Sequence, residues 1–424
     1  MIRRLLQVTH NLTNKPAPGW KKGVLSMSPT HRSKAGVALM ALALLFLMTA
    51  VGRAPAQAPP SYTKKVLYDF NGAQAGGSPN GSLLRDKSGN LYGTTYSGGS
   101  PYNGGILFKI SSSGEETVLY TFQPLGTDGA NPEAGLIQDS SGNFYGTTAG
   151  GGTYGYGTVF KLSPSHKETI LYSFQNNGKD GINPASPLVR DSSGNLYGTT
   201  PYGGTSFEGT LFKISPSGKE TILHNFSGTD GEYPANGLLL ANNLLYGSTN
   251  LGGNSTGNGV LFKMTLQGKF TVLHEFSGSD GALPIGQMII DSSGNLYGAT
   301  QSGGYMQNSC IPGGCGTVYK LSAAGKLTVY EITQGTTSGP AAGVVRDSKG
   351  NFYGTTSGDG QYSQGSIFKL NSRGTFTTLF SFNGNNGGDG SPNQGIILDN
   401  KGNIYGATAG GGTYKNGTLF EVSP

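Results

Sequence analysis

The sequence predicts an all-β fold, a seven-bladed β-propeller of four-stranded antiparallel blades, because one short phrase recurs seven times. Each phrase contains a Tyr-Gly pair, and the pairs begin at Tyr92, Tyr145, Tyr197, Tyr246, Tyr297, Tyr353 and Tyr405. The spacings between them are 53, 52, 49, 51, 56 and 52 residues. A period near fifty residues is typical of repeat architectures, so a closed propeller and an open β-solenoid are the two folds to weigh.

Four short apolar segments in each repeat predict four strands. In the second repeat they cover residues 135–139, 144–148, 157–162 and 168–174, and they are rich in β-branched and aromatic residues. The sequence between the first two, Asp139-Ser140-Ser141-Gly142-Asn143, has the residue types of a hairpin turn. No window after the leader shows sustained helical periodicity. Four antiparallel strands in about fifty residues correspond to one propeller blade.

The two ends of the repeat region favour a closed ring. The region opens with a lone segment of the fourth type, residues 65–70, and ends on a segment of the third type, residues 418–422. We therefore expect the N-terminal strand at residues 65–70 to complete the last blade, which would remove an open sheet edge. An open solenoid would need capping repeats instead.

Residues 1–56 are predicted to be a leader with a signal peptide. A positively charged segment at 31–34 precedes an uncharged apolar stretch of 16 residues at 36–51, and residues 54–56 form a small-residue cleavage site. Met27 is a second candidate start. The apolar stretch is shorter than the roughly 20 residues of a membrane span, and an uncleaved N-terminal anchor is the alternative. We expect a secreted, periplasmic or cell-surface bacterial protein.

The predicted domains after the leader are a short linker at residues 57–63 and the propeller at residues 64–424. The formal net charge of +6 belongs to the leader, which holds eight Lys or Arg and no Asp or Glu. The remainder has 21 basic and 23 acidic residues, a net charge of −2. This balance offers no basic surface for nucleic acid. We expect a monomer without a membrane span once the signal is cleaved.

The repeat phrase resembles a known family. Asn-Leu-Tyr-Gly-Thr-Thr at residues 195–200, a Gly-Gly pair, and Gly-Thr-Val-Phe-Lys-Leu at residues 157–162 are similar to the GloVer repeat, named for Gloeobacter and Verrucomicrobia. The resemblance covers all seven units, roughly residues 62–424. It implies export, as in bacterial "choice-of-anchor" proteins, and it brings no reaction and no catalytic residues. More distantly, the phrase is similar to NHL and sensor-type propeller repeats, which implies that the first strand of each blade lines a central channel.

Two sets of loops are expected to share one rim of the propeller, because alternate connections of an antiparallel meander fall on the same face. The loops after the second strands carry Tyr102, Tyr154, Tyr202, Tyr305, Tyr362 and Tyr414. The loops before the first strands carry Asp128, Asp180, Asp230, Asp280 and Asp389. Aromatic faces with nearby polar groups suit carbohydrate or extended peptide ligands. In the alternative interpretation, each aspartate only bonds the backbone of its own turn.

The remaining residues offer no catalytic motif. The second-strand tyrosines are interpreted as packing residues, and no first strand is expected to carry an acid that stands out from its copies. Cys310 and Cys315 frame an Ile-Pro-Gly-Gly segment and are predicted to form a local disulfide in an oxidising compartment. No zinc cluster, nucleophile elbow or phosphate loop is present in the sequence. We predict no catalytic residue, metal or cofactor.

Three functions fit this sequence. The first is a non-enzymatic binding or surface-interaction module for an extracellular glycan or protein. The second is an enzyme that acts on a polysaccharide or lactone at the mouth of the channel, which would need acids, histidines or a metal converging there. The third is a structural protein of the cell envelope.

Overall fold

A computed structural model describes residues 61–424 except 254, 305–312, 333–337 and 385–389. All described elements belong to the second of the chain's two units, Pro60–Pro424. The predicted leader and residues 57–60 of the predicted linker lie outside the described residues. The described part consists of strands, turns and loops, and no helix in it is long and apolar enough to cross a membrane.

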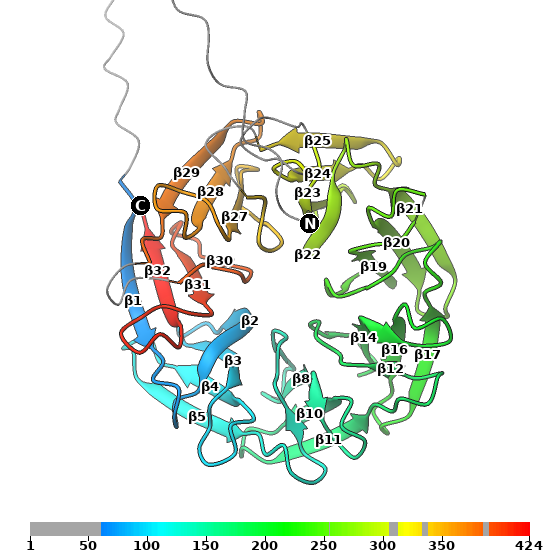
Figure 1. The fold of residues 1–424 in the computed structure, drawn as a ribbon, viewed down its shortest axis with the longest axis vertical. Coiled ribbons are helices and arrows are strands. Elements are labelled where there is room, and N and C mark those ends of the chain that lie inside the picture. Colours follow the sequence, from blue (N-terminus) through cyan, green and yellow to red (C-terminus); the bar gives the residue numbers. More distant parts are fainter. Residues whose placement is uncertain (1–60, 254, 305–312, 333–337, 385–389) are drawn as a thin grey trace, which may run out of the picture. The chain divides into compact units, whose positions relative to one another are not determined.

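Seven four-stranded antiparallel sheets form a ring, as predicted (Figure 1). The inner strands are β2 (Gly77–Arg85), β7 (Ile137–Gln138), β13 (Val189–Arg190), β18 (Leu239–Ala241), β22 (Ala282–Ile290), β26 (Val345–Arg346) and β30 (Ile397–Leu398). The second strands are β3 (Leu91–Ser97), β8 (Phe144–Thr148), β14 (Leu196–Thr200), β19 (Leu244–Thr249), β23 (Leu296–Ser302), β27 (Phe352–Thr356) and β31 (Ile404–Thr408).

The other two strands of each blade lie further from the centre of the ring. The third strands are β4 (Ile106–Ile110), β10 (Thr158–Leu162), β16 (Thr210–Ile214), β20 (Val260–Thr265), β24 (Thr317–Leu321), β28 (Ser366–Leu370) and β32 (Thr418–Ser423). The outer strands are β5 (Glu116–Thr121), β11 (Glu168–Ser173), β17 (Glu220–Asn225), β21 (Phe270–Glu275), β25 (Leu327–Glu331), β29 (Phe376–Ser381) and β1 (Thr63–Asp69). We number the blades 1 to 7 from β2 to β30.

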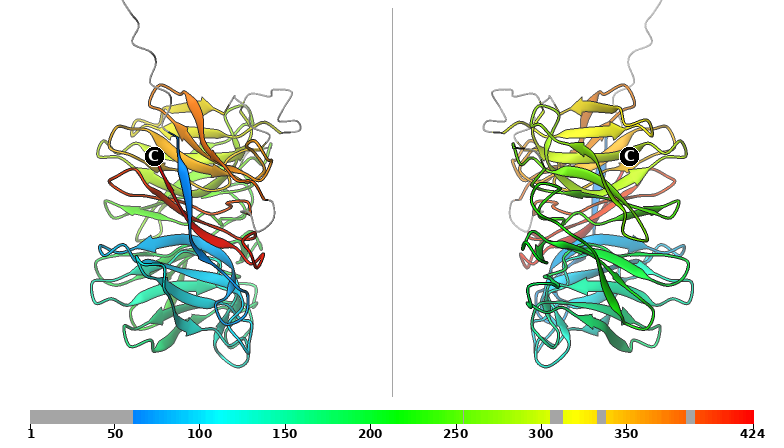
Figure 2. Two further views of the ribbon diagram at one scale, coloured as in Figure 1. Left: turned by 90° about the vertical axis from the view of Figure 1, so that its left-hand side faces the viewer. Right: turned by 90° about the vertical axis from the view of Figure 1, so that its right-hand side faces the viewer.

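The ring closes as the chain ends predict. The seventh sheet has the order β1-β32-β31-β30, so the first strand of the chain is its outer strand. The pairing of β1 with β32 runs from Thr63 opposite Ser423 to Asp69 opposite Thr418. Figure 2 shows β1 in blue alongside the red strand β32. This closure gives the last blade four strands like the others and joins the start of the described chain to its end.

Most blades pack against each other through aromatic rings of the third strands. Phe160 lies opposite Gly146 in the β8–β10 pairing, and a Cβ on that glycine would come within 2.7 Å of the Phe160 ring. The Tyr-Gly pair therefore has glycine because a third-strand ring covers its backbone. Phe160 also belongs to a buried cluster with Leu107 and Phe122 of blade 1. The apolar core thus lies in the seams between blades, where burial of each ring stabilises the closed arrangement.

The second-strand tyrosines also hold the turn that precedes them. In six blades the tyrosine hydroxyl donates a hydrogen bond to the aspartate that begins this turn, at 2.8 to 3.2 Å. Burial acts to raise the pKa of Asp291, but hydrogen bonds from Asn295, Tyr297 and the backbone outweigh it and lower this pKa to about 2. In blade 4, Ala241 replaces the aspartate, and the Tyr246 hydroxyl makes no hydrogen bond to another described residue.

The two predicted loop sets do share one face of the ring. In blade 2, β6 (Gly129–Ala130), from the loop before the inner strand, pairs with β9 (Gly150–Gly151), from the loop after the second strand. In blade 3, β12 (Gly181–Ile182) pairs with β15 (Tyr202–Gly203) in the same way. We call this face the loop rim.

Candidate ligand-binding rim

A cavity of about 760 Å³ lies at the centre of the ring and is lined by residues at and beside the inner strands of all seven blades. This agrees with the implied position of the first strands. Its polar lining includes Asn236, Gln287, Gln394 and Glu133, so the lining is not restricted to small and aliphatic groups.

Most of these polar groups hold neighbouring blades together. The Asn236 amide donates to the Pro284 carbonyl at 2.7 Å, and its oxygen accepts from the Gly286 N–H at 3.1 Å. Gln287 donates to the Leu238 carbonyl, and Gln394 donates to Asn80 across the closure of the ring. Because these groups are already paired within the ring, binding a ligand through them would require breaking a seam contact.

Glu133 is different. It is the only acidic side chain among the described residues that line the cavity, and its carboxylate has no hydrogen bond or ion pair with any described residue. Burial raises the pKa of this carboxyl. Glu133 precedes the inner strand β7 by four residues, so it lies outside the strands for which no distinctive acid was expected. Blades 3, 4 and 6 have Ala185, Ala235 and Ala341 at the same register position, and a position-by-position comparison of repeats would have found the difference.

The predicted loop tyrosines are exposed wherever the structure describes them. The exposed fractions are 39% for Tyr102, 52% for Tyr154, 41% for Tyr202, 47% for Tyr362 and 57% for Tyr414. Tyr305 lies outside the described residues. Five phenol rings on one rim are therefore available to a ligand without any change in the packed core.

The predicted rim aspartates are occupied by their own loops. Asp128 accepts hydrogen bonds from the Gln123 and Gly129 N–H groups at 2.8 and 2.6 Å and from the Tyr120 hydroxyl at 3.0 Å. Asp180 likewise accepts from Gln175 and the hydroxyl of Tyr172. Asp389 lies outside the described residues. A ligand role for these aspartates stays a prediction, while the turn-stabilising contacts are observed.

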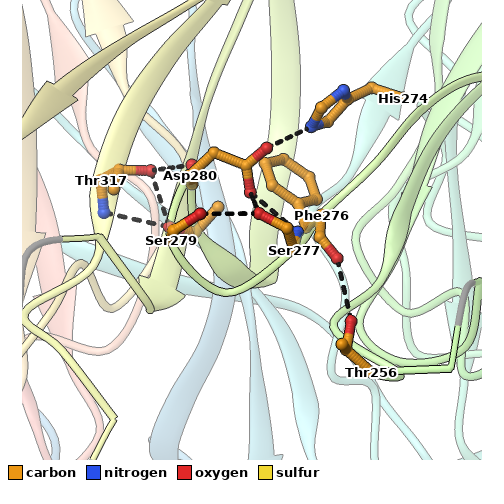
Figure 3. Close-up of polar contacts among 8 residues, drawn as sticks. Thr256, His274, Phe276, Ser277, Ser279, Asp280 and Thr317 are labelled. Atoms are coloured by element: carbon orange, nitrogen blue, oxygen red, sulfur yellow. Dashed lines mark hydrogen bonds and ion pairs between the residues drawn. The ribbon is translucent and has the colours of Figure 1, made fainter.

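Blades 3 and 4 each place a histidine, a serine and an aspartate together, but not in the order of a catalytic triad. In blade 4, His274 contacts Asp280 at 2.9 Å, and the Ser277 hydroxyl donates to the other oxygen of the same carboxylate at 3.0 Å (Figure 3). A triad needs the histidine between the serine and the acid. Here the aspartate lies between them, and His224 and Asp230 repeat the arrangement in blade 3.

The outer wall carries buried carboxyl groups at the seams between blades. Glu168 and Glu220 each have one oxygen that is buried and without a hydrogen-bond partner. Burial, with the negative charge of Asp128 next, raises the pKa of Glu168 to about 7. Burial and the neighbouring Asp180 also raise the pKa of Glu220, and Tyr172 donates to both carboxylates at 2.9 and 3.3 Å. These acids lie on the outer strands, away from the channel, so their protonation affects the stability of the ring and not the candidate site.

Two further predictions concern the cysteines and metals. Cys315 is buried and is not a free thiol, whereas its predicted partner Cys310 lies outside the described residues, so their pairing stays a prediction. No group of three or more His, Cys, Asp or Glu side chains suited to a metal ion occurs among the described residues.

The ring, its channel and its loop rim define the protein as a seven-bladed β-propeller. The profile of the Gloeobacter/Verrucomicrobia repeat matches residues 56–257 and 252–424, and the chain belongs to this family, as its repeat phrase indicates. No curated protein sequence matches the chain.

Solved structures share the fold at low identity. Virginiamycin B lyase from Staphylococcus aureus is 14% identical with a TM-score of 0.57, covering 86% of this chain and 100% of that chain. A streptogramin B lyase is 15% identical with a TM-score of 0.56, covering 85% and 97%. The extracellular domain of a hybrid two-component system from B. thetaiotaomicron is 16% identical with a TM-score of 0.54, covering 87% and 41%. These similarities extend to the fold alone.

Proposed function

We propose that this protein is an extracellular binding module whose loop rim recognises a glycan. The observation that carries the proposal is the exposure, on one face of the ring, of the five predicted rim tyrosines that the structure describes. A phenol ring offers an apolar face for the C–H groups of a sugar and a hydroxyl that exchanges hydrogen bonds with it. The predicted signal peptide adds the expectation that the protein meets extracellular ligands.

The scaffold favours binding over chemistry at this rim. Tyrosine presents a large contact area with few rotatable bonds, so fixing it against a ligand costs little entropy. The loops are held by small sheets such as β6–β9 and β12–β15, which place the rings before a ligand arrives. The rim aspartates, by contrast, already have partners within their own loops.

A glycan screen tests the proposal directly. The purified protein would be titrated with cell-wall glycans and plant polysaccharides in affinity electrophoresis and calorimetry. We expect saturable binding to at least one of them, and loss of that binding when all five described loop tyrosines are changed to serine. A protein that binds none of the glycans would refute the proposal, as would retention of full affinity without the five rings.

A second candidate function is favoured by Glu133 alone. A half-buried carboxyl with a raised pKa and no partner, at the lining of a channel, has the character of a general acid or base. Under this candidate the protein would cleave or isomerise a polysaccharide or lactone. Product formation from such substrates that disappears in Glu133→Gln would support it, and the absence of turnover in the wild type would remove it.

A further inference from the structure

One seam of the loop rim differs from the others in carrying three aromatic rings. Tyr202 lies edge-on to Tyr233 with centroids 5.2 Å apart, and its ring is 6.4 Å from that of Phe207 at a tilt of 34°. Tyr202 and Phe207 come from the β14–β16 loop of blade 3, and Tyr233 comes from the loop that enters blade 4. The exposed fraction of Phe207 is 53% and that of Tyr202 is 41%, so both rings face solvent.

Two of these rings stand at backbone positions that disfavour them. Phe207 has φ of 65° and Tyr233 has φ of 60°, in the left-handed region that bulky residues seldom occupy. At the position of Phe207, blade 2 has Gly155, whose N–H makes the same turn hydrogen bond. At the position of Tyr233, blade 3 has Asn183. Such positions cost free energy in a bulky residue. Other blades have Leu283 at the position of Tyr233 and Ser363 or Lys415 at that of Phe207, so the aromatic rings distinguish this seam among the described residues.

The substitution at Tyr233 also removes a contact that holds other seams. Asn131 and Asn183 each donate a side-chain hydrogen bond to a carbonyl of the preceding blade, to Tyr96 at 2.9 Å and to Ala149 at 2.7 Å. A tyrosine has no amide with which to repeat this bond. At the seam between blades 3 and 4, an aromatic surface therefore takes the place of the hydrogen bond that Asn131 and Asn183 make at other seams.

Acidic groups surround this surface. Glu208 accepts the Tyr233 N–H at 3.1 Å through its carbonyl, and Glu232 precedes Tyr233, so both acids lie at the same seam. Burial raises the pKa of Tyr233 to about 12, with further contributions from Tyr202 and from the negative charge of Glu133. The loop segments 201–209 and 228–235 contain no Lys or Arg.

We propose that Tyr202, Phe207 and Tyr233 form a sugar-stacking site, with Glu208 and Glu232 as its polar anchors, and that the site binds a glycan of protonated amino sugars. This inference rests on the proposed glycan-binding function and narrows it to one seam and one ligand class. The two exposed rings give a shallow surface that suits the flat face of a sugar ring. A cationic amine is attracted both by the aromatic faces and by the carboxylates of Glu208 and Glu232 at the same seam.

The ligand comparison uses oligomers of glucosamine, their fully N-acetylated counterparts and oligolysine peptides. Calorimetric titration at the highest pH that keeps the amines protonated, where the carboxylates are most ionised, is expected to show the tightest binding for the glucosamine oligomers. Added salt should weaken that binding, because screening reduces the attraction between exposed charges. Equal or tighter binding of the N-acetylated oligomers would overturn the role of the amine. Tighter binding of oligolysine would overturn the glycan class.

Variants with residues taken from other blades test the site and should keep the fold, because the same residue types occur at equivalent positions of the propeller. The triple variant Tyr202→Ser, Phe207→Gly, Tyr233→Asn installs residue types found at the equivalent positions of blades 1 to 3. Its affinity for glucosamine oligomers should fall by roughly tenfold or more. Glu208→Gln with Glu232→Gln, which removes both charges beside the rings, should also weaken binding of the charged oligomer. The matched control Val118→Thr, at an exposed position of the outer strand β5, should bind as the wild type does.

The outcomes separate this inference from the general proposal. If the triple variant keeps the wild-type affinity while the five-tyrosine variant loses it, the seam is not the site and the rim still binds glycans. If the protein binds no glycan of any kind, both proposals fail. Circular dichroism and thermal unfolding of each variant confirm that a loss of binding is not a loss of fold.

Discussion

Glu168 gives the sharpest test of the electrostatics of the ring. This carboxyl lies at the start of β11, with one oxygen buried and unpaired, and its pKa is raised from about 4.5 to about 7 by burial first and then by Asp128. Between these two values the folded protein keeps a proton that the unfolded chain releases. The free energy of unfolding contributed by Glu168 is therefore full at low pH and falls as the pH rises through this window.

The size of the effect follows from the shift. A difference of about 2.5 pKa units corresponds to about 3.4 kcal/mol as an upper bound, and solvent screening of a partly exposed side chain reduces it to about 1 kcal/mol. Glu168→Gln cannot ionise, so above about pH 7 it should raise the free energy of unfolding by that amount. For a domain of about 360 residues this corresponds to roughly 1–2 °C in Tm.

The assay is thermal unfolding of the wild type and Glu168→Gln across this pH range. The two proteins should have the same Tm near pH 4.5, and the variant should become the more stable one as the pH rises. Glu115→Gln, at an exposed neighbouring turn of blade 1, serves as the control and should show no such divergence. A Glu168→Gln protein that is equally stable or less stable at high pH would refute the reasoning.

Three further changes follow from contacts of single blades. Gly146→Ala would push a Cβ into the Phe160 ring and should lower the free energy of unfolding, measured in urea titrations, by about 1–3 kcal/mol. An unchanged free energy of unfolding would contradict this and show that the Phe160 ring moves aside. Asp291→Asn should lower the free energy of unfolding at neutral pH by about 1–3 kcal/mol, because hydrogen bonds such as that from Tyr297 are weakened or lost. This deficit should shrink as the pH falls from about 4 to about 2, where the wild-type carboxylate becomes protonated, and a deficit independent of pH would contradict the prediction. Phe207→Gly relieves a left-handed aromatic residue, so its Tm should equal or exceed that of the wild type, and a clear fall in Tm would show that the ring stabilises the fold.

The fold was predictable because each local signal occurs seven times. A single turn such as 139–143 or a single strand such as 144–148 would predict little, but the common period adds the signals together. The closure was predictable from the mismatch between the ends, residues 65–70 and 418–422, since only a ring can use that offset. The turn of blade 4 is shorter than its copies, and its residues Asn242 and Asn243 both have the left-handed φ that a short hairpin requires.

The candidate site was only partly predictable. The loop tyrosines and their rim followed from the order of strands, and their exposure agrees with a binding surface. The sequence grouped Tyr202 with Tyr154, yet Tyr202 pairs with Ile182 just as Gly150 pairs with Ala130, so it occupies a different position of the loop. Tyr202 contacts Tyr233 across the boundary between two blades. Such a contact depends on how neighbouring blades pack in the propeller, which the sequence of one repeat does not specify.

Glu133 was missed for a different reason. The fold is predicted from residues that all repeats share, and a residue present in only one copy adds nothing to that prediction. Listing what stands at the same position in every blade isolates Glu133, Phe207 and Tyr233 at once. In a repeat protein, shared residues report the fold and the copy-specific ones report where function has been added.

The most direct measurement is a crystal structure of the protein with a bound glucosamine oligomer. The account predicts a sugar ring stacked against Tyr202 and Phe207, with an amine directed toward Glu208 and Glu232. An oligomer bound on the opposite rim or on the outer wall, with these rings left free, would contradict it.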